Sequence, residues 1–126
     1  MSSKQSATSA TASDQQIVAQ FNGMRQELQN ITQKIGELEM DVDEHQLVID
    51  TMIPMEGNRK CFRLVGGVLM ERTVGEVLPA LKANHSGIKD VIDQLLQTYK
   101  KKEEEMNNFQ KKHNIRMVKP GTNPSQ

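Results

Sequence analysis

The sequence has very few of the residues that fill an ordinary globular core. Only 3% of its 126 residues are aromatic, and tryptophan is absent, although aromatic side chains supply the largest buried areas in compact domains. Eight methionines, many branched aliphatic residues and 25% charged residues remain, which is typical of a seam between helices. We therefore expect one elongated domain and not a compact globule.

The usual signals of several protein classes are missing as well. The single cysteine, Cys61, cannot form an internal disulfide, and no signal-peptide core or run of about 18 apolar residues is present. The formal net charge is zero and the pI is near 6.8, without the basic excess of nucleic-acid-binding proteins. We expect a soluble, intracellular protein with no nucleic acid and no membrane as partner.

Apolar residues recur at alternating steps of four and three along two long segments. The first pattern runs from Ile17 to Met52 and is interrupted only by His45. The second runs from Val74 to His113 and has three polar members, of which His85 lies near its start and Lys102 and His113 lie in its later half. A period of 3.5 residues keeps one stripe facing a partner helix, so the pattern predicts a coiled coil.

Local signals set the ends of these two helices. Pro54 should stop the first, which we expect over about residues 14–53. Thr73, with Glu76 three residues later, forms a capping-box sequence for the second, which we expect over about residues 74–114. The fold class is therefore mainly α, a long antiparallel two-helix coiled coil.

The two ends of the chain differ from this pattern. Residues 1–13 are rich in serine, threonine and alanine, and residues 119–126 contain two prolines. Neither segment can bury enough apolar surface to offset the entropy lost on ordering. We expect a disordered head, a folded domain over residues 14–118 and a disordered tail.

A β-hairpin over about residues 59–72 should connect the helices, because two β-leaning runs flank a glycine pair that suits a two-residue turn. A lone hairpin is marginal in water and exposes two unpaired edges. Other subunits should cover them. The residues expected to make this assembly surface are Cys61, Phe62, Leu64, Val65, Gly66, Gly67, Val68, Leu69 and Met70.

The sequence offers no convincing catalytic or metal site. The histidines His45, His85 and His113 all fall on the predicted seams, and no two lie within one helical turn of each other. The glycine pair is followed by a strand and not by the helix that a phosphate-binding loop requires. Cys61 is most simply a small apolar strand residue. We expect no enzyme activity, no metal and no cofactor.

Several local segments resemble β-type subunits of the prefoldin family. The order of long helix, glycine-pair hairpin and long helix fits that family, and residues 37–40, 44–51, 59–74, 76–81 and 112–116 resemble its sequences at the corresponding places. The resemblance covers about residues 15–118. Its hairpin segment is the most specific part, whereas residues 53–58 depart from the family pattern.

The resemblance implies a subunit of a heterohexamer of two α-type and four β-type chains. Such a prefoldin complex captures unfolded actin and tubulin and delivers them to the cytosolic chaperonin without ATP. It acts in the cytoplasm, with the nucleus as a second compartment. Two alternatives stay open: a generic coiled-coil scaffold or tether, and a subunit of a related prefoldin-like complex.

The resemblance also implies that client chains are held at the distal ends of the helices. The apolar residues there are Ile17, Val18, Phe21, Met24, Met106, Phe109, Ile115, Met117 and Val118. Four of them, however, are equally well explained as the last contacts of the seam: Ile17, Phe21, Met24 and Phe109.

A fold-back centred on the glycine pair also predicts which residues face each other across this seam. It places Met24 opposite Phe109 and brings Phe21 near His113. It also places Lys102 opposite an isoleucine, a poor pair that should loosen the seam near its end.

Overall fold

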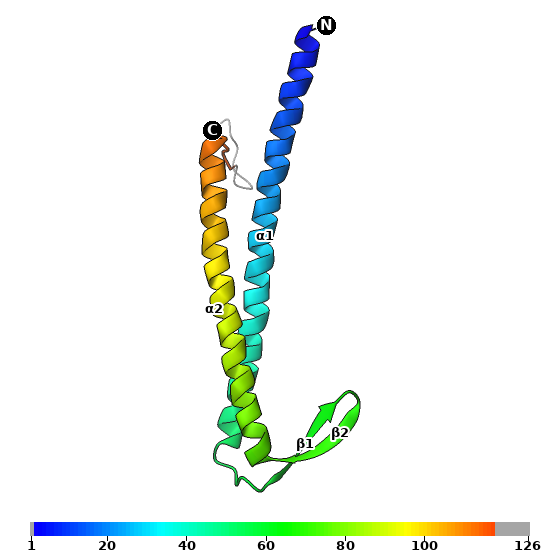
Figure 1. The fold of residues 1–126 in the computed structure, drawn as a ribbon, viewed down its shortest axis with the longest axis vertical. Coiled ribbons are helices and arrows are strands. Elements are labelled where there is room, and N and C mark those ends of the chain that lie inside the picture. The colour runs from blue at the N-terminus through cyan, green and yellow to red at the C-terminus, as the bar shows by residue number, and fades with distance from the viewer. Residues whose placement is uncertain (1, 118–126) are drawn as a thin grey trace, which may run out of the picture. The chain divides into compact units, whose positions relative to one another are not determined.

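The computed structural model describes residues 2–117 and contains two long helices joined by a two-stranded hairpin. The elements follow in the order α1 (Ser2–Met52), β1 (Lys60–Val65), β2 (Val68–Thr73) and α2 (Val74–Lys112) (Figure 1). This confirms the predicted fold class. The chain divides into two units, which are described separately. The terminal unit comprises residues 1–32 and 98–126, and the hairpin unit comprises residues 33–97.

Helix α1 begins at Ser2 and not near residue 14. The expectation of a disordered segment over residues 1–13 is therefore corrected for residues 2–13, and residue 1 lies outside the described residues. The segment contains no proline or glycine and is rich in alanine. Without a breaker, adding residues to an existing helix is much easier than nucleating one. The expected disordered tail, residues 119–126, lies outside the described residues.

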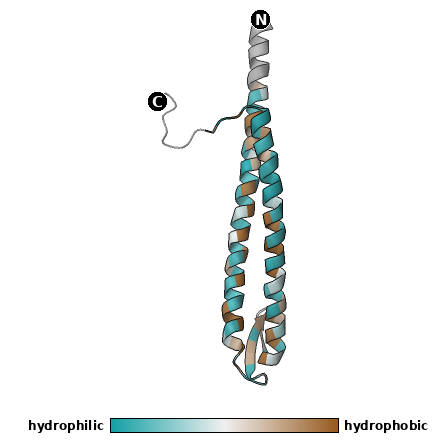
Figure 2. Cartoon of the chain, turned by 90° about the vertical axis from the view of Figure 1, so that its left-hand side faces the viewer, coloured by the Kyte–Doolittle hydropathy of each residue, from teal (hydrophilic) through white to brown (hydrophobic). Residues whose placement is uncertain are grey.

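The predicted seams are confirmed in both units. Every position of the two heptad stripes is buried or half-buried, and most residues between them are exposed. The most buried side chains are Phe21 and Leu28 in the terminal unit, and Ile49, Met52, Val74 and Ile92 in the hairpin unit. In Figure 2, hydrophobic bands recur along both helices between hydrophilic stretches, as expected for a periodic seam.

The pairing across the seam of the terminal unit differs from the prediction. The ring of Phe21 stacks on that of Phe109, with centroids 6.5 Å apart, and His113 packs on Phe109 from its own helix at 4.4 Å. The residue opposite Phe109 thus lies about one helical turn earlier in α1 than expected. The reason is the connection of residues 53–59, which separates α1 from β1, whereas β2 continues directly into α2.

Lys102 does not loosen the seam. Its Nζ donates a hydrogen bond of 2.8 Å to Oε2 of Glu27, so the side chain joins the two helices of the terminal unit. This hydrogen bond and the negative charge of Glu27 raise the pKa of Lys102. The prediction of a poor contact with Ile31 was wrong because it used the shifted register.

Three backbone N–H groups at the start of α2 have acceptors outside the helix. Those of Val74 and Gly75 donate to the carbonyl oxygens of Arg59 and Gly57, at 3.0 and 2.9 Å. That of Glu76 donates to Oγ1 of Thr73 at 3.3 Å, as the capping sequence predicts. Because the first turn of a helix leaves such donors unpaired, these bonds fix the hairpin and the preceding loop to α2.

Helix α2 ends in a closed turn within the terminal unit. Asn114 has a positive φ of 58°, a conformation that asparagine tolerates better than most residues and that often ends a helix. The backbone N–H of Ile115 then donates to the carbonyl oxygen of Gln110, and the side-chain amide of Gln110 donates to the carbonyl oxygen of Ile115. These two bonds hold Ile115 against the last turn of α2.

Two leucines of α1 provide a direct test of the seam. Leu28 is 7% exposed and Leu47 is 69% exposed, while the change in helix propensity for Leu→Ala is the same at both. We expect Leu28→Ala to lower the free energy of unfolding by about 2–5 kcal/mol through the lost contacts and the cavity. Leu47→Ala should change it by no more than about 0.5 kcal/mol. Chemical denaturation of the assembled protein measures both, and equal effects would contradict the assignment.

Charge reversal tests the register of the terminal unit. Glu27→Lys or Lys102→Glu alone places like charges together and should lower the melting temperature, whereas the double reversal should restore it. High salt should reduce these differences. Because the pKa of Lys102 is raised, its pairing contributes fully below the ordinary pKa of lysine and is lost only as the pH rises through the raised value. A double variant no more stable than the singles would refute the pairing.

Candidate protein-interaction surfaces

The hairpin is closed by the tight turn that the glycine pair predicts. Gly66 and Gly67 have positive φ values of 55° and 80°, which is the requirement of the two-residue turn that matches strand twist. The strands pair antiparallel from Lys60 opposite Thr73 to Val65 opposite Val68. Successive side chains therefore alternate between two faces, and residues opposite each other share a face.

The outer face of the hairpin is an exposed apolar patch. Phe62, Leu64 and Leu69 lie on it, with exposed fractions of 64%, 70% and 65%. Leu64 and Leu69 are directly opposite each other, and Lys60 and Glu71 form an ion pair of 3.2 Å at its margin. Large apolar side chains gathered in this way on a two-stranded sheet mark a surface for contact with another protein.

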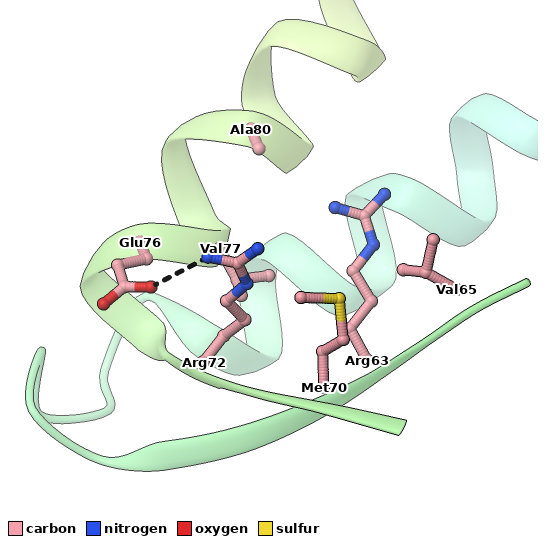
Figure 3. Close-up of a pocket in the computed structure, with 7 residues that line it drawn as sticks. All are labelled: Arg63, Val65, Met70, Arg72, Glu76, Val77 and Ala80. Carbon is pink, nitrogen blue, oxygen red and sulfur yellow. Dashed lines mark ion pairs between the residues drawn. The ribbon is translucent and has the colours of Figure 1, made fainter. Parts of the chain in front are cut away.

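The inner face of the hairpin looks onto the first turns of α2. Between them lies a groove of about 250 Å³, which we call the inner groove. Figure 3 shows side chains of the hairpin and of α2 converging on it. The lining residues are Arg63, Val65, Met70, Arg72, Glu76, Val77 and Ala80. Arg72 and Glu76 form an ion pair of 3.7 Å across one side of this groove.

The remaining predicted assembly residues are also placed by this register. Cys61 shares the inner face with Arg72 and is half-buried as a free thiol. Val65, Val68 and Met70 share that face as well and are exposed. All the residues predicted for subunit assembly thus lie in one hairpin, which presents apolar side chains on both of its faces. Sequence reasoning missed the two arginines, although their alternation with apolar residues was visible.

The residues predicted to bind clients that lie within the described chain all belong to the terminal unit, but their exposure differs. Val18 and Met117 are exposed, at 52% and 46%, and Val118 lies outside the described residues. Phe21 is only 4% exposed, so it serves the packing of the two helices. The half-buried members are Ile17, Met24, Met106, Phe109 and Ile115.

Metal-binding groups do not gather anywhere in the described part of the chain. Within it no three histidine, cysteine, aspartate or glutamate side chains are placed to hold a metal ion. Nδ1 of His45 donates to the carbonyl oxygen of Asp41 at 2.8 Å, a bond within its own helix. Neither helix, over the residues described, has a stretch long and apolar enough to cross a membrane.

Comparison with known proteins identifies the family. A family described as prefoldin subunit matches residues 15–119. The chain is 46% identical over 124 residues to prefoldin subunit 2 of Homo sapiens, covering 98% of this chain and 80% of that protein. It is 49% identical over 108 residues to the probable prefoldin subunit 2 of Schizosaccharomyces pombe, covering 85% and 95%.

A solved structure supports the fold independently. The prefoldin β subunit from Thermococcus strain KS-1 superposes with a TM-score of 0.69 at 17% sequence identity, covering 82% of this chain and 93% of that one. At this identity the likeness concerns the fold alone. Together with the match over residues 15–119 and the close relatives, it shows that the chain belongs to the prefoldin subunit family, a family of co-chaperone subunits that assemble with one another and not a family of enzymes.

Proposed function

We propose that this chain is a β-type subunit of a hexameric prefoldin with two α-type and four β-type subunits. Its hairpin joins those of neighbouring subunits, and its terminal unit holds unfolded actin and tubulin for delivery to the cytosolic chaperonin, without ATP. The observation that carries this proposal is the hairpin, whose outer-face residues Phe62, Leu64 and Leu69 are about two-thirds exposed. The names of its relatives as prefoldin subunits support the same role.

The hairpin explains why assembly is favourable. Each large apolar side chain moved from water into a subunit contact contributes on the order of 1.5–3 kcal/mol. Both strands are edges of a two-stranded sheet, so each has a row of backbone groups free to pair with another strand. A generic scaffold or tether, the alternative function, needs only a turn between its helices. It would have no use for these exposed strands.

The terminal unit suits the binding of varied unfolded chains. Val18 and Met117 are exposed there, and the same unit contains half-buried methionines at positions 24 and 106. Methionine is flexible and polarizable, so a surface containing it adapts to many partners.

A prefoldin-like complex with other α and β partners is the second candidate, since the same hairpin would serve it. In either complex we propose that the protein acts in the cytoplasm, with the nucleus as a second compartment.

Aspartate substitutions on the hairpin test its role in assembly. Leu64→Asp combined with Val68→Asp puts a charge on each face, and burying unpaired charges at a contact is strongly unfavourable. We expect loss of the hexamer in native mass spectrometry and retained helicity of the isolated chain in circular dichroism. The matched control is Met40→Asp with Leu47→Asp, at two residues of α1 that are 66% and 69% exposed. Normal hexamers from the hairpin variant would refute the proposal.

Serine substitutions in the terminal unit test client binding. Val18→Ser with Met117→Ser removes exposed apolar side chains and leaves the buried Phe21 in place. We expect the hexamer to form normally but to suppress the aggregation of unfolded actin several-fold less well, because each lost apolar contact weakens binding. Met40→Ser with Leu47→Ser is the control for a general loss of apolar surface. Unchanged suppression by the Val18 and Met117 variant would remove these residues from the client site.

A further inference from the structure

The inner groove carries a cationic side chain without a counter-ion in the described part of the chain. Arg63 and Arg72 both line the groove, but Arg72 is paired with Glu76. No carboxylate of residues 2–117 lies within ion-pair distance of Arg63. The groove therefore has an excess of about one positive charge.

The rest of the groove is apolar. Val65 and Met70 line it from the hairpin, and Val77 and Ala80 line it from α2. A cation beside an apolar wall recognises a ligand that carries one negative charge on a short aliphatic stem. The planar guanidinium of arginine binds a carboxylate through two parallel hydrogen bonds, and such charge-assisted pairs are among the stronger polar contacts in proteins.

The geometry of the hairpin indicates how such a group would arrive. A strand that pairs with an edge of β1 or β2 continues the sheet, and its side chains then alternate between the two faces. Those on one side would meet the outer face, where Phe62, Leu64 and Leu69 lie. Those on the other side would point toward the inner groove, where Arg63 lies opposite Met70.

We propose that the inner groove receives an aspartate or glutamate side chain from an edge-pairing strand of a neighbouring prefoldin subunit, with Arg63 as its partner. The same strand presents apolar side chains to the outer face. This inference rests on the proposed function, since it requires that the hairpin pairs with another subunit. It adds a charge requirement for that neighbour, which assembly through apolar contacts alone would not impose.

Arg63→Met tests the charge requirement, because methionine keeps much of the aliphatic stem and loses the guanidinium. We expect the apparent Kd for incorporation into the hexamer to rise at least about tenfold, as for loss of a hydrogen bond to a charged group. The matched control is Arg59→Met, at an exposed arginine just before β1 that does not line the groove. Equal affinities of the two variants would overturn the proposal.

Salt provides a second readout that a merely structural role of Arg63 would not change. Between about 0.05 M and about 0.5 M salt, the affinity of the unmodified chain should fall more steeply than that of the Arg63→Met variant, because screening weakens an ion pair that the variant lacks. Parallel salt dependences would count against the pair. If the Arg63→Met chain loses helicity, Arg63→Gln replaces it in both measurements.

Cross-linking identifies the occupant directly. In the hexamer, the amine introduced by Arg63→Lys should be joined by a zero-length carbodiimide reagent to an aspartate or glutamate of a neighbouring subunit, which mass spectrometry of the digested complex then locates. Arg59→Lys is the control. A cross-link to Glu76 of the same chain alone, or none, would overturn the proposal.

These outcomes separate the groove from the assembly role as a whole. If the Leu64→Asp and Val68→Asp chain still enters the hexamer, the proposed role of the hairpin fails. If that variant is excluded while Arg63→Met assembles with unchanged affinity and salt dependence, the role of the hairpin stands and only the charge requirement fails.

Discussion

Two helices that meet along a single stripe can bury only one side of each, and this limit governs the rest of the molecule. Most seam residues stay half-buried, and only a few, such as Phe21 and Ile92, are below a tenth exposed. Such a fold has little interior, and no polar or charged residue of the described chain is buried. Most of its residues lie at the surface, which suits a member of a family of co-chaperone subunits that assemble with one another.

The seams and the hairpin could be predicted because their signals are local and periodic. The four-and-three spacing identifies the side of each helix that is buried, and the glycine pair identifies the turn. The register could not be predicted in this way. A repeating stripe looks nearly the same after a shift of one turn, so the offset depends on the irregular connection of residues 53–59, which no period describes. Phe21 therefore meets Phe109, and Lys102 meets Glu27.

The start of α1 and the inner groove escaped prediction for different reasons. Low apolar content argues that a segment does not pack, but it does not prevent a helix that is already nucleated from continuing through alanine and serine. The inner groove is built from alternate residues of the hairpin together with the first turns of α2. The inner groove could be predicted only from the angle between the hairpin and α2. That angle depends on the hydrogen bonds from the backbone N–H groups of Val74 and Gly75 to the preceding loop.

In the proposed hexamer, the two faces of the hairpin contribute differently to the association of subunits. Apolar burial at the outer face is non-directional and would accept many strands, so it contributes affinity with little choice of neighbour. A single uncompensated cation on the inner face favours a strand with a carboxylate at the matching position and disfavours one with lysine or arginine there. If related subunits with similar hairpins associated through apolar surface alone, they could be arranged around the proposed hexamer in many different orders. The charge on Arg63 is the kind of feature that restricts them.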